Sequence, residues 1–395
     1  MVDCTYLIKY DILQYMYIKR NLEIVLKKHL FKQNVLVLYG PRQSGKTTLV
    51  KEVVKEYGDQ VKFIDCELME NKEILSFKSS EQLFSLVKGY KIIVFDEAQV
   101  IPNIGSILKT LFDHHPEVQY IATGSSSFDL ANKISEPLTG RSLEFILYPI
   151  SLAEVTNSAF DAEQYLFTLM RFGGYPRLIS ENEDEKILRI QTILSQYLYK
   201  NVLMIGGIKK PEVISQLLKL LAFQIGHEVS YSELSRQLKV NQQTVEHYID
   251  LLEKNFIIFR LSAFSRNLRN EVTRTKKIYF VDLGIRNAII DSLQPVNTTA
   301  RNDIGVLFEN AMIIERMKLF ANSGVFQPSK YFWRTFSQQE IDYLEEREGK
   351  LHATEFKWNE AKASSAPKTF AHAYPEASYT VVTPGTAYAF VTQTE

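Results

Sequence analysis

Hydrophobic positions in the first part of the chain fall into short runs, and stretches with helical spacing separate these runs. We expect five strands, at 35–39, 61–65, 91–95, 118–122 and 143–147, of which 35–39 and 91–95 are typical of buried strands. Strands that alternate with helices are typical of a parallel sheet covered by helices. An amphipathic segment from Asn21 to Phe31 is expected to pack on this sheet as a further helix.

The pattern changes after the fifth run. Residues 151–205 have helical spacing throughout and are interpreted as a helical lid. Within residues 206–300, a capping box at Ser230 opens a short helix and Asn241 caps a second one. Two strands joined by a basic stretch follow these helices. This order predicts a winged helix.

The last segment begins with an amphipathic helix, predicted from about Ile304 to Phe320. Three strands are expected after it, at 331–334, 340–344 and 353–358. The chain of 395 residues is long enough for several domains. We expect a parallel-sheet α/β core with its N-terminal helix, a lid, a winged helix and a C-terminal α/β domain, at 1–150, 151–205, 206–300 and 301–395.

A glycine-rich segment directly follows the first predicted strand. It fits the phosphate-binding pattern G-x-x-x-x-G-K-[ST] at every fixed position and reads Gly40-Pro41-Arg42-Gln43-Ser44-Gly45-Lys46-Thr47, with Thr48 continuing into a helix. Backbone N–H groups at a helix N-terminus bind phosphate. Lys46 is expected to reach the β- and γ-phosphates, and the Thr47 hydroxyl to ligate Mg²⁺. The sequence therefore predicts a site for ATP and Mg²⁺.

Two acids end the third predicted strand. An apolar run of this kind is typical of a strand buried on both faces, which places Asp96 at its carboxyl end near the metal. Glu97 is then positioned to orient or deprotonate the attacking water. The alternative is a strand that simply ends in solvated acids. The complete phosphate loop upstream favours ATP hydrolysis.

Three acids and a lysine form a second candidate site in the last segment. Glu355 and Lys357 share one face of a predicted strand, and Asp342 on a neighbouring strand can join them. Asp342 and Glu355, together with Glu309, are expected to hold Mg²⁺ through oxygen ligands, and Lys357 to position the attacking water or stabilise developing charge. The arrangement resembles the PD-(D/E)XK nuclease core, although no proline precedes Asp342. The alternative is a nuclease-like fold that only binds a partner.

Charge is balanced over the whole chain but not along it. The 46 Lys and Arg equal the 46 Asp and Glu, so the net charge does not indicate a nucleic-acid partner. From Gly206 to Ile290, however, 13 basic residues stand against 8 acidic ones, a net charge of +5. Five of the bases are clustered: Arg266, Arg269, Arg274, Lys276 and Lys277. The winged helix is interpreted as a DNA-binding module, with a connector or protein-binding module as the alternative.

Composition narrows the cellular setting. The longest apolar runs are far shorter than the ~20 residues of a membrane-spanning helix. The N-terminal residues do not have the pattern of a secretory signal. Two cysteines, Cys4 and Cys66, provide neither a disulfide framework nor a zinc site. We therefore expect a cytoplasmic protein without membrane contact.

The motifs resemble those of AAA+-like ATPases of bacteria and archaea that carry a G-P-R-Q-x-G-K-T loop. The resemblance continues through four further segments: Asp96-Glu97-Ala98-Gln99, the sensor-like Thr123–Ser127, Leu138–Arg141 with Tyr148–Glu154, and the lid signature Phe172-Gly173-Gly174-Tyr175-Pro176. Members of this family often carry a winged helix and a restriction-nuclease-like domain at the C-terminus. The implied fold class is α/β: a parallel-sheet P-loop ATPase with a lid, a winged helix and an α/β nuclease-like domain.

The resemblance also implies two further site residues. Arg141 would stabilise charge on the γ-phosphate, within its own subunit or across the interface of a homo-oligomer. The alternative for Arg141 is an ion pair with Glu136 or Glu144. Ser125 (or the serine after it) stands where many AAA+ proteins have a sensor asparagine, and it would hydrogen-bond the attacking water.

Two functions are compatible with these motifs. The first is an ATP-regulated enzyme that binds and processes DNA and carries a metal-dependent nuclease-like domain. The second resembles the signalling ATPases: a nucleotide-driven switch whose C-terminal half binds a protein partner and does not cut nucleic acid.

Overall fold

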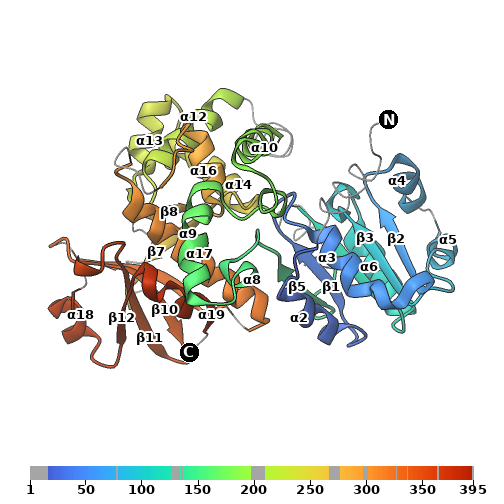
Figure 1. The fold of residues 1–395 in the computed structure, drawn as a ribbon. Coiled ribbons are helices and arrows are strands. Elements are labelled where there is room, and N and C mark those ends of the chain that lie inside the picture. Colours follow the sequence, from blue (N-terminus) through green and yellow to red (C-terminus); the bar gives the residue numbers. More distant parts are fainter. Residues whose placement is uncertain are drawn as a thin grey trace, which may run out of the picture.

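Two sheets lie at opposite ends of the chain, with helices between them (Figure 1). The computed structural model describes residues 17–76, 79–125, 134, 137–196, 210–266, 276–296, 301–325, 327–335, 337–362 and 364–393. The central helices are α8 (Leu152–Val155), α9 (Ala159–Phe172) and α17 (Ile304–Ser323). Within the described ranges, no helix has the length and apolar character needed to cross a membrane.

The N-terminal sheet has five parallel strands in the order β2-β3-β4-β1-β5. They are β1 (Val35–Tyr39), β2 (Val61–Asp65), β3 (Ile92–Asp96), β4 (Gln119–Gly124) and β5 (Ser142–Ile146). Every residue of β1 and β4 is buried, as expected for strands covered on both faces. The parallel α/β fold predicted for this part of the chain is confirmed.

Helices cover both faces of this sheet: α2 (Leu22–His29), α3 (Lys46–Val54), α4 (Met69–Leu75), α5 (Ser80–Ser85) and α6 (Ile104–His114). Leu26 of α2 and Val53 of α3 pack in one cluster against β1. Leu83 of α5 and Leu108 of α6 belong to the larger core, which continues into the C-terminal half. The predicted N-terminal helix is confirmed as α2.

The middle of the chain is mainly helical. After α9 come α10 (Glu183–Gln196), α12 (Pro211–Phe223), α13 (Tyr231–Leu238), α14 (Gln242–Lys254) and α16 (Leu283–Ile289). The Ser230 hydroxyl accepts a hydrogen bond from Glu233 N at 3.4 Å, and Asn241 Oδ1 accepts one from Thr244 N at 2.7 Å. Both predicted helix caps are therefore present.

The second sheet has seven strands in the order β12-β11-β10-β9-β7-β8-β6. They are β6 (Glu228–Val229), β7 (Ile258–Ala263), β8 (Lys276–Phe280), β9 (Ser329–Arg334), β10 (Glu340–Arg347), β11 (Lys350–Phe356) and β12 (Ser378–Val382), with short helices α18 (Lys368–Ala373) and α19 (Ala387–Thr392). Strand β7 pairs in parallel with β9 through Ser262–Tyr331 and Ala263–Phe332. Strands from before and after residue 300 therefore form one mixed sheet.

Helix α17 lies at the centre of the molecule. The sequence predicts an amphipathic helix here, but α17 is buried on all sides, including its charged residues Glu315, Arg316 and Lys318. It contacts α2 and β5 as well as β8 and β11. A helix that touches both sheets has no solvent-facing side, and its charged residues are paired inside the protein.

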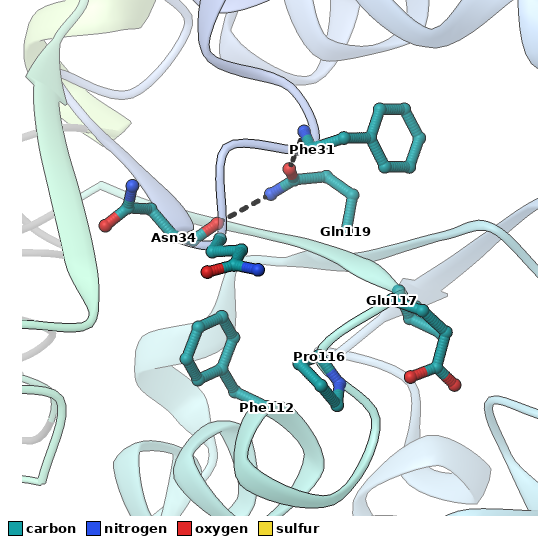
Figure 2. Close-up of a pocket in the computed structure, with 8 residues that line it drawn as sticks. Phe31, Asn34, Phe112, Pro116, Glu117 and Gln119 are labelled. Carbon is teal, nitrogen blue, oxygen red and sulfur yellow. Dashed lines mark hydrogen bonds between the residues drawn. The ribbon is translucent and has the colours of Figure 1, made fainter.

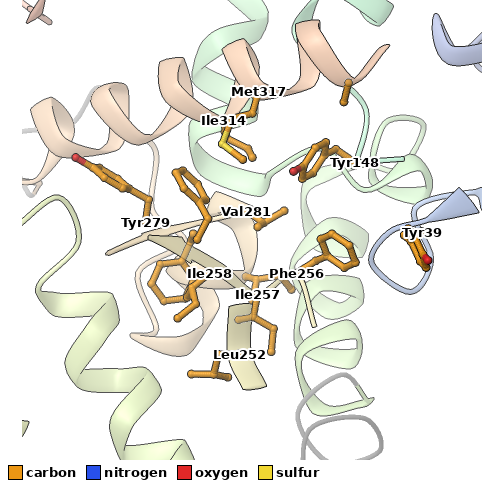
Figure 3. Packing of buried hydrophobic residues seen from close by; sticks show 14 of the residues in the cluster. Tyr39, Tyr148, Leu252, Phe256, Ile257, Ile258, Tyr279, Val281, Ile314 and Met317 are labelled. Carbon is orange, nitrogen blue, oxygen red and sulfur yellow. The ribbon is translucent and has the colours of Figure 1, made fainter. Parts of the chain in front are cut away.

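The core is continuous between the two halves of the chain. Tyr148, just after β5, meets Phe256 edge to face, with ring centroids 6.3 Å apart. Figure 3 shows this pair together with Val281, Ile314 and Met317 in one buried cluster. The ATPase sheet is therefore packed directly against the C-terminal half.

Candidate nucleotide site and C-terminal acid site

The phosphate loop connects β1 to α3 at the carboxyl edge of the parallel sheet. A Cβ at Gly40 would lie 2.2 Å from Leu147 O, so only glycine allows the loop to pass β5 this closely. Gly45 has φ 95°, a left-handed conformation that favours glycine and turns the chain into α3. Glycine is therefore required at position 40 by close packing and favoured at position 45 by the backbone conformation.

Lys46 lies across the loop. Its side chain is buried, and Nζ donates hydrogen bonds of 3.0 Å to Gly40 O and Pro41 O. Burial lowers the pKa of Lys46 to about 8, against the opposing charges of Glu97 and Asp96. The ammonium is thus poorly solvated and readily stabilised by an anion.

ATP affinity should fall as the pH rises above about 8. The triphosphate favours charged Lys46, so binding above this pKa requires uptake of a proton, and affinity should fall by as much as about tenfold per pH unit. Titration with a fluorescent ATP analogue from pH 7 to 9.5 measures this. Lys46→Arg keeps its charge throughout and should give a flat profile. Parallel profiles for the two proteins would contradict the assignment.

The metal-binding residues expected at this site lie together. Thr47 Oγ1 donates to Asp96 Oδ2 at 2.8 Å, and Thr123 Oγ1 donates to Asp96 Oδ1 at 2.5 Å. Asp96 ends β3 and Thr123 lies on the neighbouring strand β4. A hydroxyl and a carboxylate at the mouth of a phosphate loop are oxygen ligands that suit Mg²⁺. These residues fit the predicted metal.

Glu97 is held by a residue that sequence reasoning did not select. Its Oε2 accepts a 2.6 Å hydrogen bond from Gln99 Nε2, which also lies 3.2 Å from Ser125 Oγ. Glu97 N donates to Thr123 Oγ1 at 3.1 Å. Gln99 therefore brings the expected base and the expected sensor serine together. The position of Gln99 in the motif Asp96-Glu97-Ala98-Gln99 was the sequence feature that could have indicated this role.

Arg141 lies at the opposite edge of the sheet. It directly precedes β5, so it is at the amino end of the parallel strands, whereas the phosphate loop follows the carboxyl end of β1. Five residues of strand separate the two edges by roughly 16 Å. Arg141 Nε pairs with Asp113 Oδ1 at 2.8 Å. Arg141 therefore forms an ion pair, as in the alternative interpretation, but its partner is Asp113 and not Glu144; Glu136 lies outside the described residues.

A cavity of about 260 Å³ opens at this same amino edge. Gln119 lines it, accepting a hydrogen bond from Phe31 N at 2.6 Å and donating one to Asn34 O at 2.9 Å (Figure 2). Phe112 and Pro116 complete the wall. None of the cavity's lining residues belongs to the phosphate loop, so this cavity is distinct from the nucleotide site.

Two buried residues that sequence reasoning missed support the phosphate loop. Arg20 donates to Ser44 O at 2.9 Å and to Tyr148 O at 2.7 Å, and its Nε pairs with Glu154 Oε1 at 3.0 Å. Glu154 Oε2 accepts hydrogen bonds from Ser151 N and Oγ. Glu154 lies in a motif segment, whereas nothing in the sequence around Arg20 indicated its role.

The two glycines of the lid motif, Gly173 and Gly174, are held between Ile150 of the N-terminal half and Asp282 of the C-terminal half. Gly174 O accepts from Ile150 N at 2.7 Å, and Gly174 N donates to Asp282 Oδ2 at 2.8 Å. Gly173 has φ 76°, and a Cβ there would lie 2.0 Å from Asp282 Oδ1. The Pro176 ring lies 3.8 Å from the Cβ position of Gly45. The lid is therefore anchored directly beside the phosphate loop.

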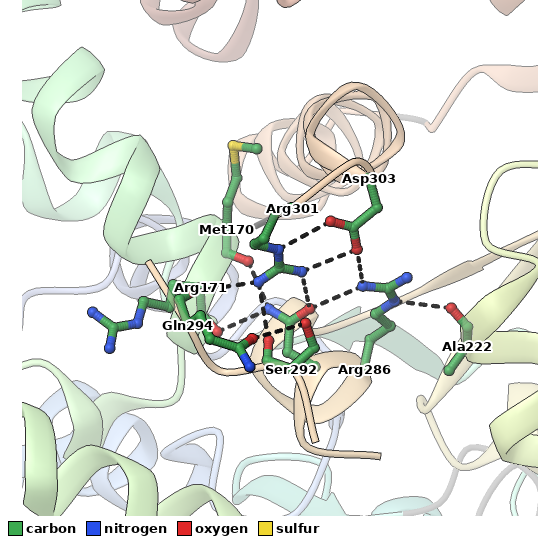
Figure 4. A network of polar contacts seen from close by, with 9 residues as sticks. Met170, Arg171, Ala222, Arg286, Ser292, Gln294, Arg301 and Asp303 are labelled. Carbon is green, nitrogen blue, oxygen red and sulfur yellow. Dashed lines mark hydrogen bonds and ion pairs between the residues drawn. The ribbon is translucent and has the colours of Figure 1, made fainter. Parts of the chain in front are cut away.

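A second polar network joins the lid to the C-terminal half (Figure 4). Buried Arg286 and Arg301 both pair with Asp303. Arg301 also binds Asn287 Oδ1, and Asn287 Nδ2 donates to Met170 O and Arg171 O at 2.9 Å each. These groups satisfy one another, so the network holds the lid in place.

The second candidate site forms where β10 and β11 pair. Their antiparallel register, with Tyr343 opposite Thr354, places Asp342 beside Glu355. Asp342 Oδ2 accepts a hydrogen bond from Phe356 N at 2.9 Å, and Lys357 Nζ lies 2.5 Å from Glu355 Oε1. The structure thus brings together the three residues that the sequence placed on adjacent strands.

The two carboxyl groups of this acid site would be stabilised by a bound cation. Burial raises the pKa of Asp342 well above its usual value, and the charges of Glu309 and Glu355 add to the shift. Glu355 Oε2 is buried and has no hydrogen-bond partner among the described residues. A buried unpaired oxygen beside a second carboxylate fits a divalent ion.

Glu309 lies near Asp342 but is bound by two other side chains. Its Oε1 accepts a hydrogen bond from Tyr279 Oη at 2.5 Å and lies 3.3 Å from Lys277 Nζ. In the described part of the chain, no three acidic, histidine or cysteine side chains are grouped closely enough to hold a metal. The two strand carboxylates are therefore the ligands that the arrangement offers.

Family models match three successive segments of the chain. Residues 32–156 match an AAA domain, residues 163–296 a domain of unknown function (DUF8612), and residues 304–394 a domain of unknown function (DUF4143). An uncharacterized protein of Mycobacterium tuberculosis is 26% identical over 86% of this chain and 74% of its own length. An uncharacterized protein of Methanocaldococcus jannaschii is 25% identical over 65% of this chain and 63% of its own length.

Solved structures resemble the chain only distantly. The Walker-type ATPase of Pyrococcus abyssi aligns with a TM-score of 0.49 and 16% identity, covering 69% of this chain and 96% of that one. The Pif1 helicase from Bacteroides aligns with a TM-score of 0.27 and 15% identity over 47% and 53%. The family match, the loop and the strand order confirm the ATPase part of the predicted architecture. Residues 32–156 match the AAA domain model and have the parallel-sheet fold of a P-loop ATPase.

Proposed function

We propose that the chain hydrolyses ATP to control the binding and cleavage of DNA at the C-terminal acid site. The observation that carries this proposal is the grouping of Asp342, Glu355 and Lys357, with a buried Glu355 oxygen that lacks a partner among the described residues. A carboxylate pair with an adjacent ammonium suits phosphodiester hydrolysis.

Each residue of the ATPase site has a chemical role in this proposal. Thr47 and Asp96 would hold Mg²⁺, and Lys46 with the loop N–H groups would bind the phosphates of ATP. Glu97 takes the proton of the attacking water, and Ser125 helps to orient that water. Gln99 bridges Glu97 and Ser125, so it aligns the base with the γ-phosphate.

At the acid site, Asp342 and Glu355 would hold a divalent cation, which supplies Lewis-acid activation of water and of the scissile phosphate. Lys357 lies against Glu355 and is partly exposed, so it can donate to the phosphate or to the leaving oxygen. Burial alone would lower the pKa of Lys357, but the Glu355 contact and the Asp342 charge raise it. Lys357 is therefore a stable ammonium.

Helix α9 connects the two sites. Its C-terminal end leads into Gly173 and Pro176 beside the phosphate loop. Its middle carries Phe167, which packs edge to face on Trp358, with centroids 5.4 Å apart. Trp358 directly follows Lys357. A shift of the lid on nucleotide binding or hydrolysis would therefore act on the strand end that carries the catalytic lysine.

Helix α17 supplies a parallel connection. Lys318 Nζ donates to Ile150 O at 3.0 Å, and Glu315 Oε2 accepts from Leu152 N at 2.6 Å, both just beyond the ATPase sheet. The same helix carries Glu309 at the acid site. One buried helix thus contacts the nucleotide-binding half and the acid site, which supports coupling between them.

The helices and strands of residues 211–280 offer a surface for DNA. The N-terminal residues of α14, Gln242 and Gln243, are exposed, and so are His247 and Arg266. We interpret α13, α14, β7 and β8 as a winged helix in which α14 enters a groove. The basic residues Arg269 and Arg274 of the expected wing lie outside the described residues.

Arg141 acts across subunits in this proposal. Its place at the amino edge of the sheet separates it from its own phosphate loop. It is partly exposed there, so a neighbouring copy of the chain can receive it. A homo-oligomer would then complete each ATPase site.

The wild-type protein should cut DNA in a metal-dependent and ATP-sensitive reaction. Supercoiled and linear DNA are incubated with Mg²⁺ or Mn²⁺, with and without ATP, and compared with Lys357→Ala. Loss of one group that acts in the transition state should lower cleavage by about 10²- to 10⁴-fold. Lys350→Ala is the matched control, because Lys350 is exposed on the same strand. Cleavage that persists in Lys357→Ala would come from another source.

The second candidate is a nucleotide-driven switch whose C-terminal half binds a protein partner. The observation that favours it is the direct anchoring of the lid beside the phosphate loop, which would transmit nucleotide state without any cleavage. No cutting, no DNA binding in a shift assay and an ATPase rate that ignores DNA would together select the switch.

A further inference from the structure

Lys277 occupies an unexpected place beside the acid site. The sequence grouped it with the exposed bases of the wing, but its side chain is only 2% exposed. Nζ lies 3.3 Å from Glu309 Oε1 and pairs closely with Glu340 Oε1. It also lies 5.4 Å from the centre of the Phe332 ring. A buried ammonium without a counter-charge would destabilise the fold, so Lys277 depends on the carboxylates that it contacts.

Lys277 reaches this place because β8 belongs to the shared sheet. In β8 it pairs with Leu261 on one side and Glu228 on the other. The strand order then sets β7 and β9 between β8 and the acid-bearing strand β10. Lys277 Nζ nevertheless meets Glu309 of α17 and Glu340 of β10, whose side chains reach toward it. A residue from before position 300 thus neutralises acids that come after it.

The charges of the cluster divide into two halves. Glu309 and Glu340 are paired with Lys277, and Arg334 lies 3.4 Å from the second oxygen of Glu340. In the other half, Lys357 contacts Glu355 Oε1, and the charges of Lys357 and Lys277 both act on Asp342. The unpartnered oxygen is on the second half, at Glu355 Oε2. Glu309 and Glu340 are therefore neutralised by direct ion pairs, whereas the second half offers a carboxylate oxygen that has no partner in the described part of the chain.

We propose that Lys277 takes the place of a second metal ion, so that the C-terminal acid site binds one divalent cation, at Asp342 and Glu355, and not two. This inference rests on the proposed metal site. Glu309 is then a structural partner of Lys277 and Tyr279 and is not a metal ligand. A single ion at Asp342 and Glu355 would then supply the Lewis-acid activation, together with the ammonium of Lys357.

The number of bound Mn²⁺ ions tests this inference. Isothermal titration and Mn²⁺ spin resonance count the ions bound by the nucleotide-free full chain, for the wild type and for Asp342→Asn. The difference between the two counts is the number of ions at the acid site, because ions bound at the ATPase site are present in both proteins. The wild type should bind one ion more than Asp342→Asn. Lys277→Gln, which has no charge, should gain a second ion or bind Mn²⁺ at least tenfold more tightly. Lys276→Gln, the adjacent and partly exposed lysine, should behave as the wild type.

Each outcome has a distinct meaning. Two ions lost from the wild type, or one ion with unchanged affinity in Lys277→Gln, would overturn the role of Lys277 and leave the proposed metal site intact. No ion lost from the wild type would overturn both. The wild-type count alone decides between one ion and two if Lys277→Gln does not fold.

Discussion

Replacing Glu97 with glutamine should lower ATP turnover by about 10²- to 10⁴-fold, the usual effect of losing a general base. ATP binding should persist, because Lys46, Thr47 and the loop glycines that bind the phosphates are unchanged. The amide keeps the shape of the side chain and can still meet Gln99, which lies 2.6 Å from the carboxylate. Phosphate release under saturating ATP and binding of a fluorescent analogue measure the two effects separately.

The matched control is Glu117→Gln. Glu117 is an exposed acid of the same domain, at the opposite edge of the sheet beside β4. Its replacement should leave both turnover and binding as in the wild type. Undiminished hydrolysis by Glu97→Gln would remove Glu97 from its proposed role, and lost binding would point instead to a collapse of the loop.

The largest effect on stability should come from Glu154→Ala. The side chains of Glu154 and Arg20 are 0% and 4% exposed, and removing the acid leaves a buried guanidinium without its counter-charge. Breaking a buried pair from one side costs about 3–5 kcal/mol. Asn21 N, 2.9 Å from Glu154 Oε1, also loses its acceptor. Urea denaturation followed by circular dichroism measures the change.

This substitution should also weaken ATP binding, because Arg20 holds Ser44 O of the phosphate loop. Glu163→Ala is the control. Glu163 is an exposed acid on α9, and its loss should leave both stability and binding unchanged. Wild-type stability in Glu154→Ala would mean that Arg20 finds water or another acceptor, and the proposed support of the loop would then be wrong.

Local patterns were sufficient for the N-terminal half. The five strand positions follow from short runs rich in apolar residues, and each was predicted within two residues. Gly40 to Thr47 and Asp96-Glu97 are contiguous motifs, so the identity and approximate place of the ATPase residues follow from order alone. The caps Ser230 and Asn241 were equally local, since each binds an N–H three residues away.

Distant pairs were not predictable in this way. The partner of Arg141 is Asp113, which lies on helix α6 and carries no motif. Arg20 meets Glu154 across 134 positions of sequence. An ion pair between distant residues depends on how the elements pack, and many acids in the chain could have served equally well.

The sequence by itself determined the P-loop ATPase domain and the residue types of both candidate sites, because glycine turns, buried strands and the two-residue period of a strand are local properties. Only the tertiary structure decided that β7 and β9 share one sheet, that α17 is buried on every side, and that Lys277 lies among the C-terminal acids and not on the wing. The physical reason is that burial and pairing are set by whole surfaces that meet in space, and a charged residue is neutralised by whichever opposite charge the packing brings to it.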